Sequence, residues 1–237
     1  MPIEFAVASP VTIRVARSDR DLARVFALRA RSHAAIGSSP ASDRYDRLPN
    51  STLLLAEAAF DGEALGTLRI LAGDRGPMMV DGLLELPASM KHRSIAEGSR
   101  LVVREGPHAQ DVRRMLWKAF HRYCLAAQVQ TMLVAAREAA ARDYEWLGFT
   151  DVFPGGALFA PRGRELATHR LLQLGVFEAH EAMMRSGHPL REFFFLERHP
   201  EIDLLGGAVG AASRAAAPPT IPDHLRMAAQ LAEVAIV

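Results

Sequence analysis

The sequence predicts an α/β protein whose mixed β-sheet carries helices on both faces. Alternating, β-branched segments such as residues 11–16 are typical of strands that bury one face. Apolar residues recur at helical spacing between residues 111 and 128, which indicates a long amphipathic helix. Strand and helix patterns follow one another in the order β-α-loop-β-β-β-α-β-α-β. This order is typical of a mixed sheet that is covered on both sides.

Local signals set the boundaries of these elements. Ser18 followed by Asp21 is a helix-start signal, because each side chain can accept a hydrogen bond from the backbone N–H group of the other. Asp61 and Gly62 between two strand patterns predict a hairpin, and Gly148 predicts the end of a helix. The expected strands are residues 11–16, 53–59, 64–71, 101–103, 131–135 and one or more within 149–159; the expected helices are residues 18–37, 111–128 and 137–146, with a polar loop or short helical turns over 37–50.

The pattern changes beyond residue 164. Residues 164–186 look helical, residues 192–196 are apolar, and residues 208–222 are rich in alanine and proline, which is typical of a mobile segment. Residues 223–234 have the spacing of one last short helix. We therefore expect one α/β domain over residues 1–164 and a partly helical C-terminal extension over residues 165–237.

Composition excludes several classes of protein. The net charge of +1 over 237 residues makes no electrostatic case for nucleic-acid binding. Cys124 is the single cysteine, which excludes an internal disulfide framework and a cysteine-based zinc cluster, and we expect no metal. No apolar stretch approaches the roughly 20 residues that span a bilayer, and the first ten residues lack the basic start of a signal peptide. We therefore expect a cytoplasmic protein without a membrane span; its oligomeric state has no signal in the sequence.

Two arginines lie in apolar surroundings. Helical spacing places Arg29 on or beside the buried face of the first helix. Because an unpaired buried charge is costly, its guanidinium needs carboxylates, with Asp43 and Asp46 nearby in the sequence, or a ligand anion, or else it reaches water as a snorkelling side chain. Arg69 alternates with apolar neighbours along a strand, and it is either a fork for a carboxylate or phosphate or a solvent-facing strand residue.

Two further residues can move protons. Glu97 comes just before the strand expected at residues 101–103, where a carboxylate can act as a general base that deprotonates an amine. The alternative is a structural salt bridge between Glu97 and Arg100. Tyr144 lies near the end of the last predicted helix, and a phenol with a reference pKa of about 10 can protonate a departing thiolate. The alternative is an aromatic side chain that only packs.

These residues together resemble a known family. Residues 144–149 (Tyr-Glu-Trp-Leu-Gly-Phe) look like the late motif of the GNAT acyltransferases. Earlier segments, in their order and spacing, resemble the N-acyl amino acid synthases and the acyl-homoserine lactone synthases, and the likeness spans residues 12–164. The segments that carry it are Arg29, then Asp43 and Asp46, then Gly66-Thr67-Leu68-Arg69, then Glu97-Gly98-Ser99-Arg100-Leu101-Val102-Val103.

The resemblance implies the GNAT fold and an N-acyltransferase. Such an enzyme moves an acyl group from a pantetheine thioester, carried by an acyl carrier protein or by coenzyme A, to the amine of an amino acid or a similar acceptor. The implied catalytic residues are Glu97 and Tyr144, the implied substrate-binding residues are Arg29, Asp43, Asp46, Arg69 and Arg100, and the implied donor-binding residues are Leu101, Val102 and Val103.

The loop after residue 103 departs from the family's coenzyme A pattern. GNAT enzymes that use acetyl-CoA carry a glycine-rich turn whose N–H groups hold a pyrophosphate. Here Pro107 lacks an N–H group, and Glu105 and Asp111 repel phosphate. The departure favours an acyl carrier protein as the donor. Basic residues at positions 113, 114, 118, 121 and 122 either steer such an acidic carrier or form an ordinary solvated helix face.

Three alternatives stay open. An acyl-homoserine lactone synthase takes S-adenosylmethionine as acceptor, and those enzymes carry tryptophans in the N-terminal arm, whereas Trp117 and Trp146 lie later in this chain. An acetyl-CoA-dependent acetyltransferase and a non-catalytic module that binds an acyl ligand are the other two. Apolar residues of the extension either cover a long acyl chain or pack against the domain: Leu171, Leu172, Phe193, Phe194 and Phe195.

Overall fold

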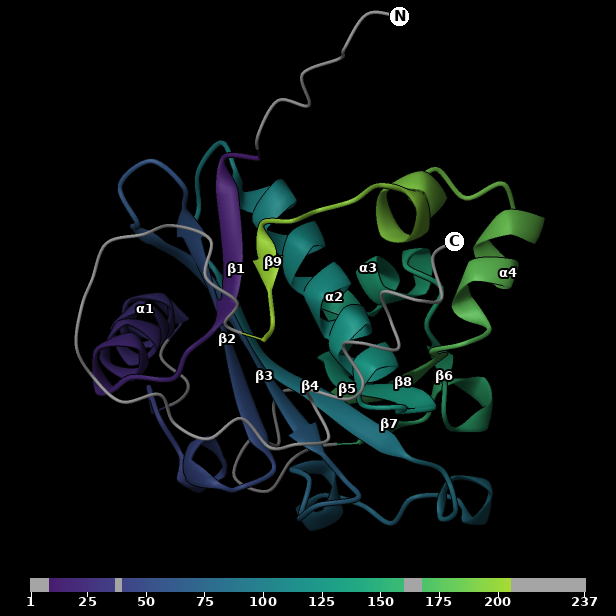
Figure 1. Cartoon of the computed structure of the whole chain (residues 1–237). Helices are drawn as coiled ribbons and strands as arrows, with labels where there is room; N and C mark the ends of the chain where they lie inside the picture. Colours follow the sequence, from purple (N-terminus) through teal and green to yellow (C-terminus); the bar gives the residue numbers. More distant parts are fainter. Residues whose placement is uncertain (1–8, 37–39, 160–167, 206–237) are drawn as a thin grey trace, which may run out of the picture.

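A computed structural model describes residues 9–36, 40–159 and 168–205. This part of the chain holds one nine-stranded mixed sheet with the strand order β6-β8-β5-β4-β3-β2-β1-β9, and β7 pairs with β8 (Figure 1). Two of the strand pairs, β4 with β5 and β1 with β9, are parallel. The strands are β1 (Val11–Val15), β2 (Ser51–Ala58), β3 (Ala64–Ala72), β4 (Ile95–Val103), β5 (Thr131–Arg137), β6 (Thr150–Asp151), β7 (Leu158–Phe159), β8 (His169–Gly175) and β9 (Ile202–Asp203).

Helices cover both faces of this sheet, so the predicted fold class is confirmed. The helix α1 (Asp19–Ile36) lies on one side, and α2 (Ala109–Ala126), α3 (Ala141–Trp146) and α4 (Ala179–Arg185) lie on the other (Figure 1). Short 3₁₀ turns are Arg44–Arg47, Val80–Gly82, Ala88–Met90, Glu138–Ala140 and Pro154–Gly156, and Glu192–Leu196 is a π-helical turn. We call the two sides the α1 face and the α2 face.

Strand alternation divides the core between these faces. In β2, Leu53 and Leu55 pack in the cluster that contains α1 residues, whereas Leu54 and Ala56 pack in the cluster built on α2. Successive side chains of a strand point to opposite faces, and both faces are covered here. The strand therefore reads as a nearly continuous apolar run and not as an alternation of apolar and polar residues.

The predicted signals at the ends of elements form as expected. Ser18 Oγ accepts a hydrogen bond from the Asp21 N–H group at 3.1 Å, and Asp21 Oδ2 accepts one from the Ser18 N–H group at 3.2 Å, so the capping box at the start of α1 is present. Gly62 takes a φ of 70° in the turn between β2 and β3, and Gly148 takes a φ of 92° after α3. Glycine adopts this left-handed region without the steric cost of a side chain.

The prediction of a helix over residues 164–186 was wrong for much of its length. Residues His169–Gly175 form β8, which pairs antiparallel with β5, and a helix begins only at Ala179. Leu171 packs on the α1 face and Leu172 on the α2 face, so the strand is buried on both sides. A short apolar run of this kind does not distinguish a buried strand from a helix. The sheet thus continues past the boundary expected at residue 164; residues 208–222 and 223–234 lie outside the described part.

Two predicted boundaries near the site were also wrong. The strand expected at residues 101–103 is the end of β4, which begins at Ile95, so Glu97 lies within the strand and not before it. The strand expected at residues 131–135 continues to Arg137, and the helix expected from residue 137 begins at Ala141 after a 3₁₀ turn. Charged residues at positions 97, 100 and 137 interrupt the apolar runs near these boundaries.

A β-bulge in β4 separates its two halves. Arg69 of β3 lies opposite Ser99 and Thr67 lies opposite Val102, so β4 carries one residue more than β3 over this stretch. Arg100, in the bulge, has a φ of 55°, which is uncommon for a residue other than glycine. The parallel pairing of β4 with β5 reaches Gly98 and ends there, whereas the pairing of β4 with β3 continues to Val103.

We predict that Gly98→Ala destabilises the protein by about 1–3 kcal/mol, which is typical of overpacking. A Cβ atom at this position would lie 2.7 Å from Cε1 of Phe120 in α2, which is too close for an ordinary contact. Urea unfolding measures the loss. As a control, the double variant Gly98→Ala, Phe120→Leu should lose less than the sum of the single losses. Additive losses would show that the contact with Phe120 is not the cause.

Candidate active site

The structure brings five of the predicted site residues into one ion network on the α1 face. Asp46 Oδ1 accepts hydrogen bonds from Arg29 at 2.8 Å and from Arg69 at 3.1 Å. Arg69 also donates to Asp43 Oδ1 at 2.5 Å. The side chains of Arg29, Arg69 and Asp46 are fully buried. The alternatives of a snorkelling Arg29 and of a solvent-facing Arg69 were therefore wrong.

The turn between α1 and β2 supplies both carboxylates of this network. Asp43 caps the 3₁₀ turn Arg44–Arg47, with its Oδ1 accepting from the Tyr45 N–H group at 2.9 Å, and Asp46 Oδ2 accepts from the Asp43 N–H group at 2.9 Å. In Asp46 the backbone holds Oδ2 while Oδ1 binds arginine; in Asp43 the backbone-held Oδ1 also binds Arg69, and Oδ2 is left for another partner. The capping box sets the direction of both side chains.

Arg100 joins the network from the bulge in β4. Its Nε and Nη2 atoms lie 3.2 and 2.6 Å from Asp43 Oδ2, and its Nη1 donates to the Pro40 carbonyl at 3.2 Å. Burial acts to raise the pKa of Asp43, but the hydrogen bonds from Arg69 and Arg100 outweigh it and leave that pKa lowered. Three guanidinium groups meet two carboxylates, which leaves one net positive charge in the network.

Glu97 lies beside this network without forming an ion pair with it. Its side chain is fully buried; Oε2 accepts a hydrogen bond from the Val80 N–H group at 3.1 Å, and Oε1 has no partner among the described residues. Burial raises the pKa of Glu97 to about 7, although hydrogen bonds from the backbone of Val80 and Met79 act to lower it. The salt bridge between Glu97 and Arg100 was a wrong alternative, because Arg100 pairs with Asp43.

Tyr144 lies on the opposite face of the sheet from Glu97. Its ring packs edge-on against Trp117 of α2 and against Phe149, with centroid distances of 5.2 and 5.8 Å. Burial raises the pKa of its phenol to about 12. Glu97 and Ser99 instead point to the α1 face, where they contact Val80 and Arg69. The two predicted proton-transfer residues can therefore meet one substrate only where β4 and β5 part beyond Gly98.

Residues Leu101, Val102 and Val103 form the part of β4 that has left β5. Their main chain is paired with β3 on one side, through Thr67 and Gly66. On the side toward β5 the register ends at Gly98, so backbone N–H and C=O groups of this segment face the point where the strands diverge. An extended ligand can pair with such an open strand edge.

The predicted basic face of α2 is only partly present. Lys118 and His121 are buried, and Arg122 donates to the His199 carbonyl at 2.8 Å. Residues 193–199 cover these three side chains. The sequence did not predict this cover, because these residues were expected to belong to a separate extension. Arg113 stays exposed and Arg114 is half-buried, both near the start of the helix.

Several contacts in the site were missed by the sequence analysis. Arg69 Nε donates to Ser99 Oγ at 3.0 Å, and the guanidinium of Arg69 lies 5.5 Å from the ring centroid of Tyr45. Ser99 had a detectable signal, because its position on β4 is two residues from Glu97 and hence on the same face. The backbone donors that hold Glu97 had no such signal. Every residue except proline has a main-chain N–H group, so residue type does not indicate which of these groups binds a side chain.

We predict that Asp46→Asn lowers the free energy of unfolding by about 3–5 kcal/mol, the usual effect of removing one partner of a buried ion pair. The change would leave Arg29 with no carboxylate partner among the described residues. Urea unfolding measures it. Glu85→Gln is the matched control, because Glu85 pairs with Lys91 on the surface and its side chain is 83% exposed; no measurable change in stability is expected there. Equal losses in the two variants would contradict a buried network.

Comparisons with known proteins identify the family of the chain. A family model described as N-acyl amino acid synthase FeeM matches residues 24–155, a stretch that contains all the site residues above. Among solved structures, FeeM, an N-acyl amino acid synthase from uncultured soil microbes, superimposes with a TM-score of 0.60 at 17% identity, over 77% of this chain and 96% of that one. No curated protein matches the chain.

Two acyl-homoserine lactone synthases share the fold. The coenzyme A-dependent synthase BjaI, solved with S-adenosylmethionine and isopentyl-CoA, has a TM-score of 0.55 at 16% identity, covering 93% of this chain and 99% of its own. LasI has a TM-score of 0.54 at 20% identity, covering 71% and 91%. No helix in the described part of this chain is long and apolar enough to cross a membrane. The match over residues 24–155 takes in more than half of the 237 residues, and the chain therefore belongs to the FeeM family of N-acyl amino acid synthases and is an N-acyltransferase.

Proposed function

We propose that this N-acyltransferase moves a long acyl group from a pantetheine thioester on an acyl carrier protein to the α-amine of a free amino acid. The observation that carries the proposal is Glu97, a buried carboxylate beside a network of net positive charge, with one oxygen that has no partner in the part of the chain that the structure describes. An amino acid that acts as the acyl acceptor needs both groups close together. A base must remove a proton from its amine, and a region of positive charge must hold its carboxylate.

The reaction needs one base and one acid. Glu97 takes a proton from the acceptor's ammonium group, directly or through water, and the free amine attacks the thioester carbonyl. A C–N bond forms, the C–S bond breaks, and the thiolate takes a proton from Tyr144, which regains one from the new amide nitrogen. N–H groups of Leu101–Val103 facing the diverging strands are suited to polarise the thioester carbonyl. Because Glu97 and Tyr144 lie on opposite faces, we place the thioester carbon between them, at the end of the β4–β5 pairing.

Arg100 is the arginine best placed to meet the acceptor's carboxylate. Its side chain is 13% exposed, whereas those of Arg29 and Arg69 are fully buried. Arg29 and Arg69 then act as positioning residues, because they hold Asp46 and Asp43, and Asp43 holds Arg100. A bidentate guanidinium–carboxylate contact would select an amino acid over an amine without a carboxylate.

The start of α2 supports a carrier-protein donor over free coenzyme A. The Ala109 N–H group is already bonded to the Gly106 carbonyl at 3.1 Å, Pro107 offers none, and Asp111 lies in the first turn. These features leave a poor cradle for a pyrophosphate. Burial raises the pKa of the Tyr144 phenol, and Arg113 lies close enough to oppose that rise, so its positive charge is near the proposed entry of the pantetheine arm.

We predict that kcat/KM for acyl transfer rises with pH and levels off above about 7, because Glu97 must be ionised to accept a proton and its pKa is about 7. Glu97→Gln should lower kcat by about 10²–10⁴-fold, the usual contribution of a general base. Release of the free thiol, followed against pH, measures both. Glu85→Gln, a surface carboxylate, should leave the profile unchanged. A wild-type profile flat between pH 5 and 8 would contradict Glu97 as the base.

We also predict that Arg113→Glu weakens use of an acyl carrier protein by about tenfold in kcat/KM, as expected when a charge near a docking site is reversed. The same acyl group on free pantetheine should lose much less in kcat/KM, because that donor has no protein to dock. Arg185→Glu is the control, since this arginine is exposed on α4. If the wild type prefers acyl-CoA to the acyl carrier protein, the proposed donor is wrong.

A further inference from the structure

The carboxylate of Glu97 is held by a short segment of the loop between β3 and β4. Its Oε2 atom accepts a hydrogen bond from the Val80 N–H group at 3.1 Å, and the backbone of Met79 bonds to the same carboxylate. Its Oε1 atom has no partner among the described residues. The loop therefore holds one oxygen of Glu97 and leaves the other for a ligand.

Packing and one buried amide fix the position of this segment, residues 77–82. Met78 and Val80 are buried in an apolar cluster on the α1 face, and they are 6% and 0% exposed. Asn50, which is 3% exposed, donates from Nδ2 to the Pro77 carbonyl at 3.1 Å. These anchors place the segment beside Glu97. The directions of its N–H groups depend in addition on the turn that the segment contains.

Asp81 caps this turn. Its Oδ2 atom accepts a hydrogen bond from the Met78 N–H group at 2.7 Å. An aspartate side chain that bonds a nearby backbone N–H group is a common way to fix a turn. Met79 and Val80, the two donors to Glu97, lie between the ends of this bond in the sequence. Asp81 itself is exposed, so burial of apolar surface does not hold its side chain in place.

Asp81 acts on Glu97 in two opposite ways. Burial raises the pKa of Glu97 to about 7, and the negative charge of Asp81 acts in the same direction. The N–H groups of Met79 and Val80, which the cap holds, act to lower that pKa because they favour the ionised carboxylate, and the charge of Arg69 on β3 also lowers it. The other charged groups beside Glu97 on the α1 face are Arg29, Asp43, Asp46 and Arg100.

We propose that Asp81 is a positioning residue for the base. By capping the turn, it directs the Met79 and Val80 N–H groups at one oxygen of Glu97, and this contact decides which oxygen is left to take the acceptor's proton. The role of Glu97 as the base rests on the proposed function, whereas the cap and its hold on Glu97 rest on the contacts above.

Titration of the wild type by NMR tests the hold on Glu97 without any turnover. The amide signal of Val80 should shift with pH at the same midpoint as the carboxyl carbon of Glu97, because the N–H group bonds to that carboxylate. A Val80 amide signal that does not follow the Glu97 carboxyl carbon would overturn the proposal.

The pH profile of acyl transfer tests Asp81. Asp81→Asn keeps an accepting oxygen and removes the charge, so the midpoint of kcat/KM should move to lower pH, with a gain of about twofold at pH 6, the usual size for an exposed charge. Asp81→Ala removes the oxygen as well, and its midpoint should lie above that of Asp81→Asn. Asp74→Asn, which changes an exposed aspartate of the same loop, should leave the midpoint unchanged. Equal midpoints in the two Asp81 variants would overturn the positioning role.

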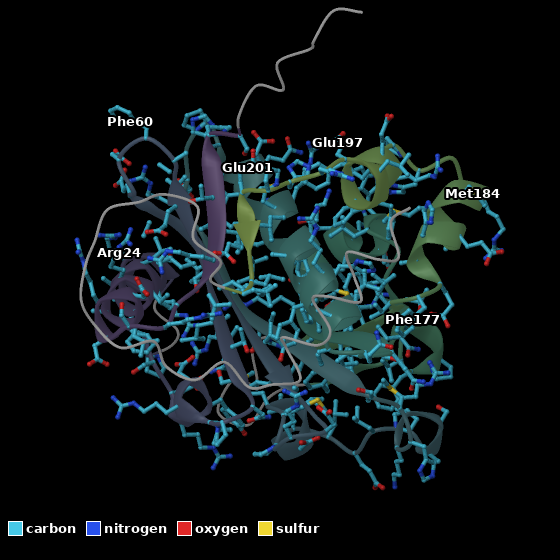
Figure 2. The ribbon with its side chains drawn as sticks, viewed as in Figure 1. Arg24, Phe60, Phe177, Met184, Glu197 and Glu201 are labelled. Atoms are coloured by element: carbon cyan, nitrogen blue, oxygen red, sulfur yellow. The ribbon has the colours of Figure 1, made fainter. Side chains whose placement is uncertain are left out.

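Hydrogen exchange separates a failure of the cap from a failure of the proposed function. Asp81→Ala should speed exchange of the Met78 and Val80 N–H groups about tenfold, as expected for weakened local protection, and Asp81→Asn should stay close to the wild type. The helix α4, which carries Met184 and lies on the α2 face (Figure 2), should keep its exchange rates in both variants. Unchanged exchange in Asp81→Ala would overturn the cap. The expected exchange and titration in a protein without acyl transfer would support the cap and count against the proposed function alone.

Discussion

The buried ion network of Arg29, Asp46, Arg69, Asp43 and Arg100 is the constraint on which the rest of the site depends. It joins α1, the turn after α1, β3 and β4, which are far apart in sequence. A buried ion pair adds little net stability over apolar packing, but breaking one is costly. The network therefore acts less as a source of stability than as a fixed geometry: each arginine must reach its carboxylate, so the four segments have one arrangement.

That geometry divides the enzyme into two unlike halves. The α1 face carries the charged network and Glu97, and the α2 face carries Tyr144 among apolar side chains. An acyl transfer to an amino acid needs both environments, because one substrate is charged and the other has an aliphatic tail. The sheet separates the two, and we propose that the substrates meet at the bulge at Arg100, where β4 leaves β5.

Sequence patterns predicted the parts of this account that depend on residue type and order. The capping box at Ser18, the hairpin at Gly62 and the helix α2 have local signals, and the five network residues were recognised through a family likeness. The sequence analysis missed the strand β8 and the position of Glu97 inside β4. A strand that is buried on both faces lacks the alternation of apolar and polar residues by which a strand is recognised. Both interpretations of Lys118, a face that steers an acidic carrier and a solvated helix face, place it at the surface, whereas the tertiary fold brings the carbonyls of Phe193 and Glu197 to it.

Mass spectrometry of lipid extracts tests the central claim most directly, with cells that overproduce this protein compared with cells that overproduce its Glu97→Gln variant at an equal level of folded protein. The account predicts N-acyl amino acids that are present with the wild type and absent with the variant, and their masses identify the acceptor and the chain length. Acyl-homoserine lactones in place of N-acyl amino acids would contradict the assignment of the acceptor. N-acyl amino acids at equal levels in both cultures would contradict Glu97 as the base.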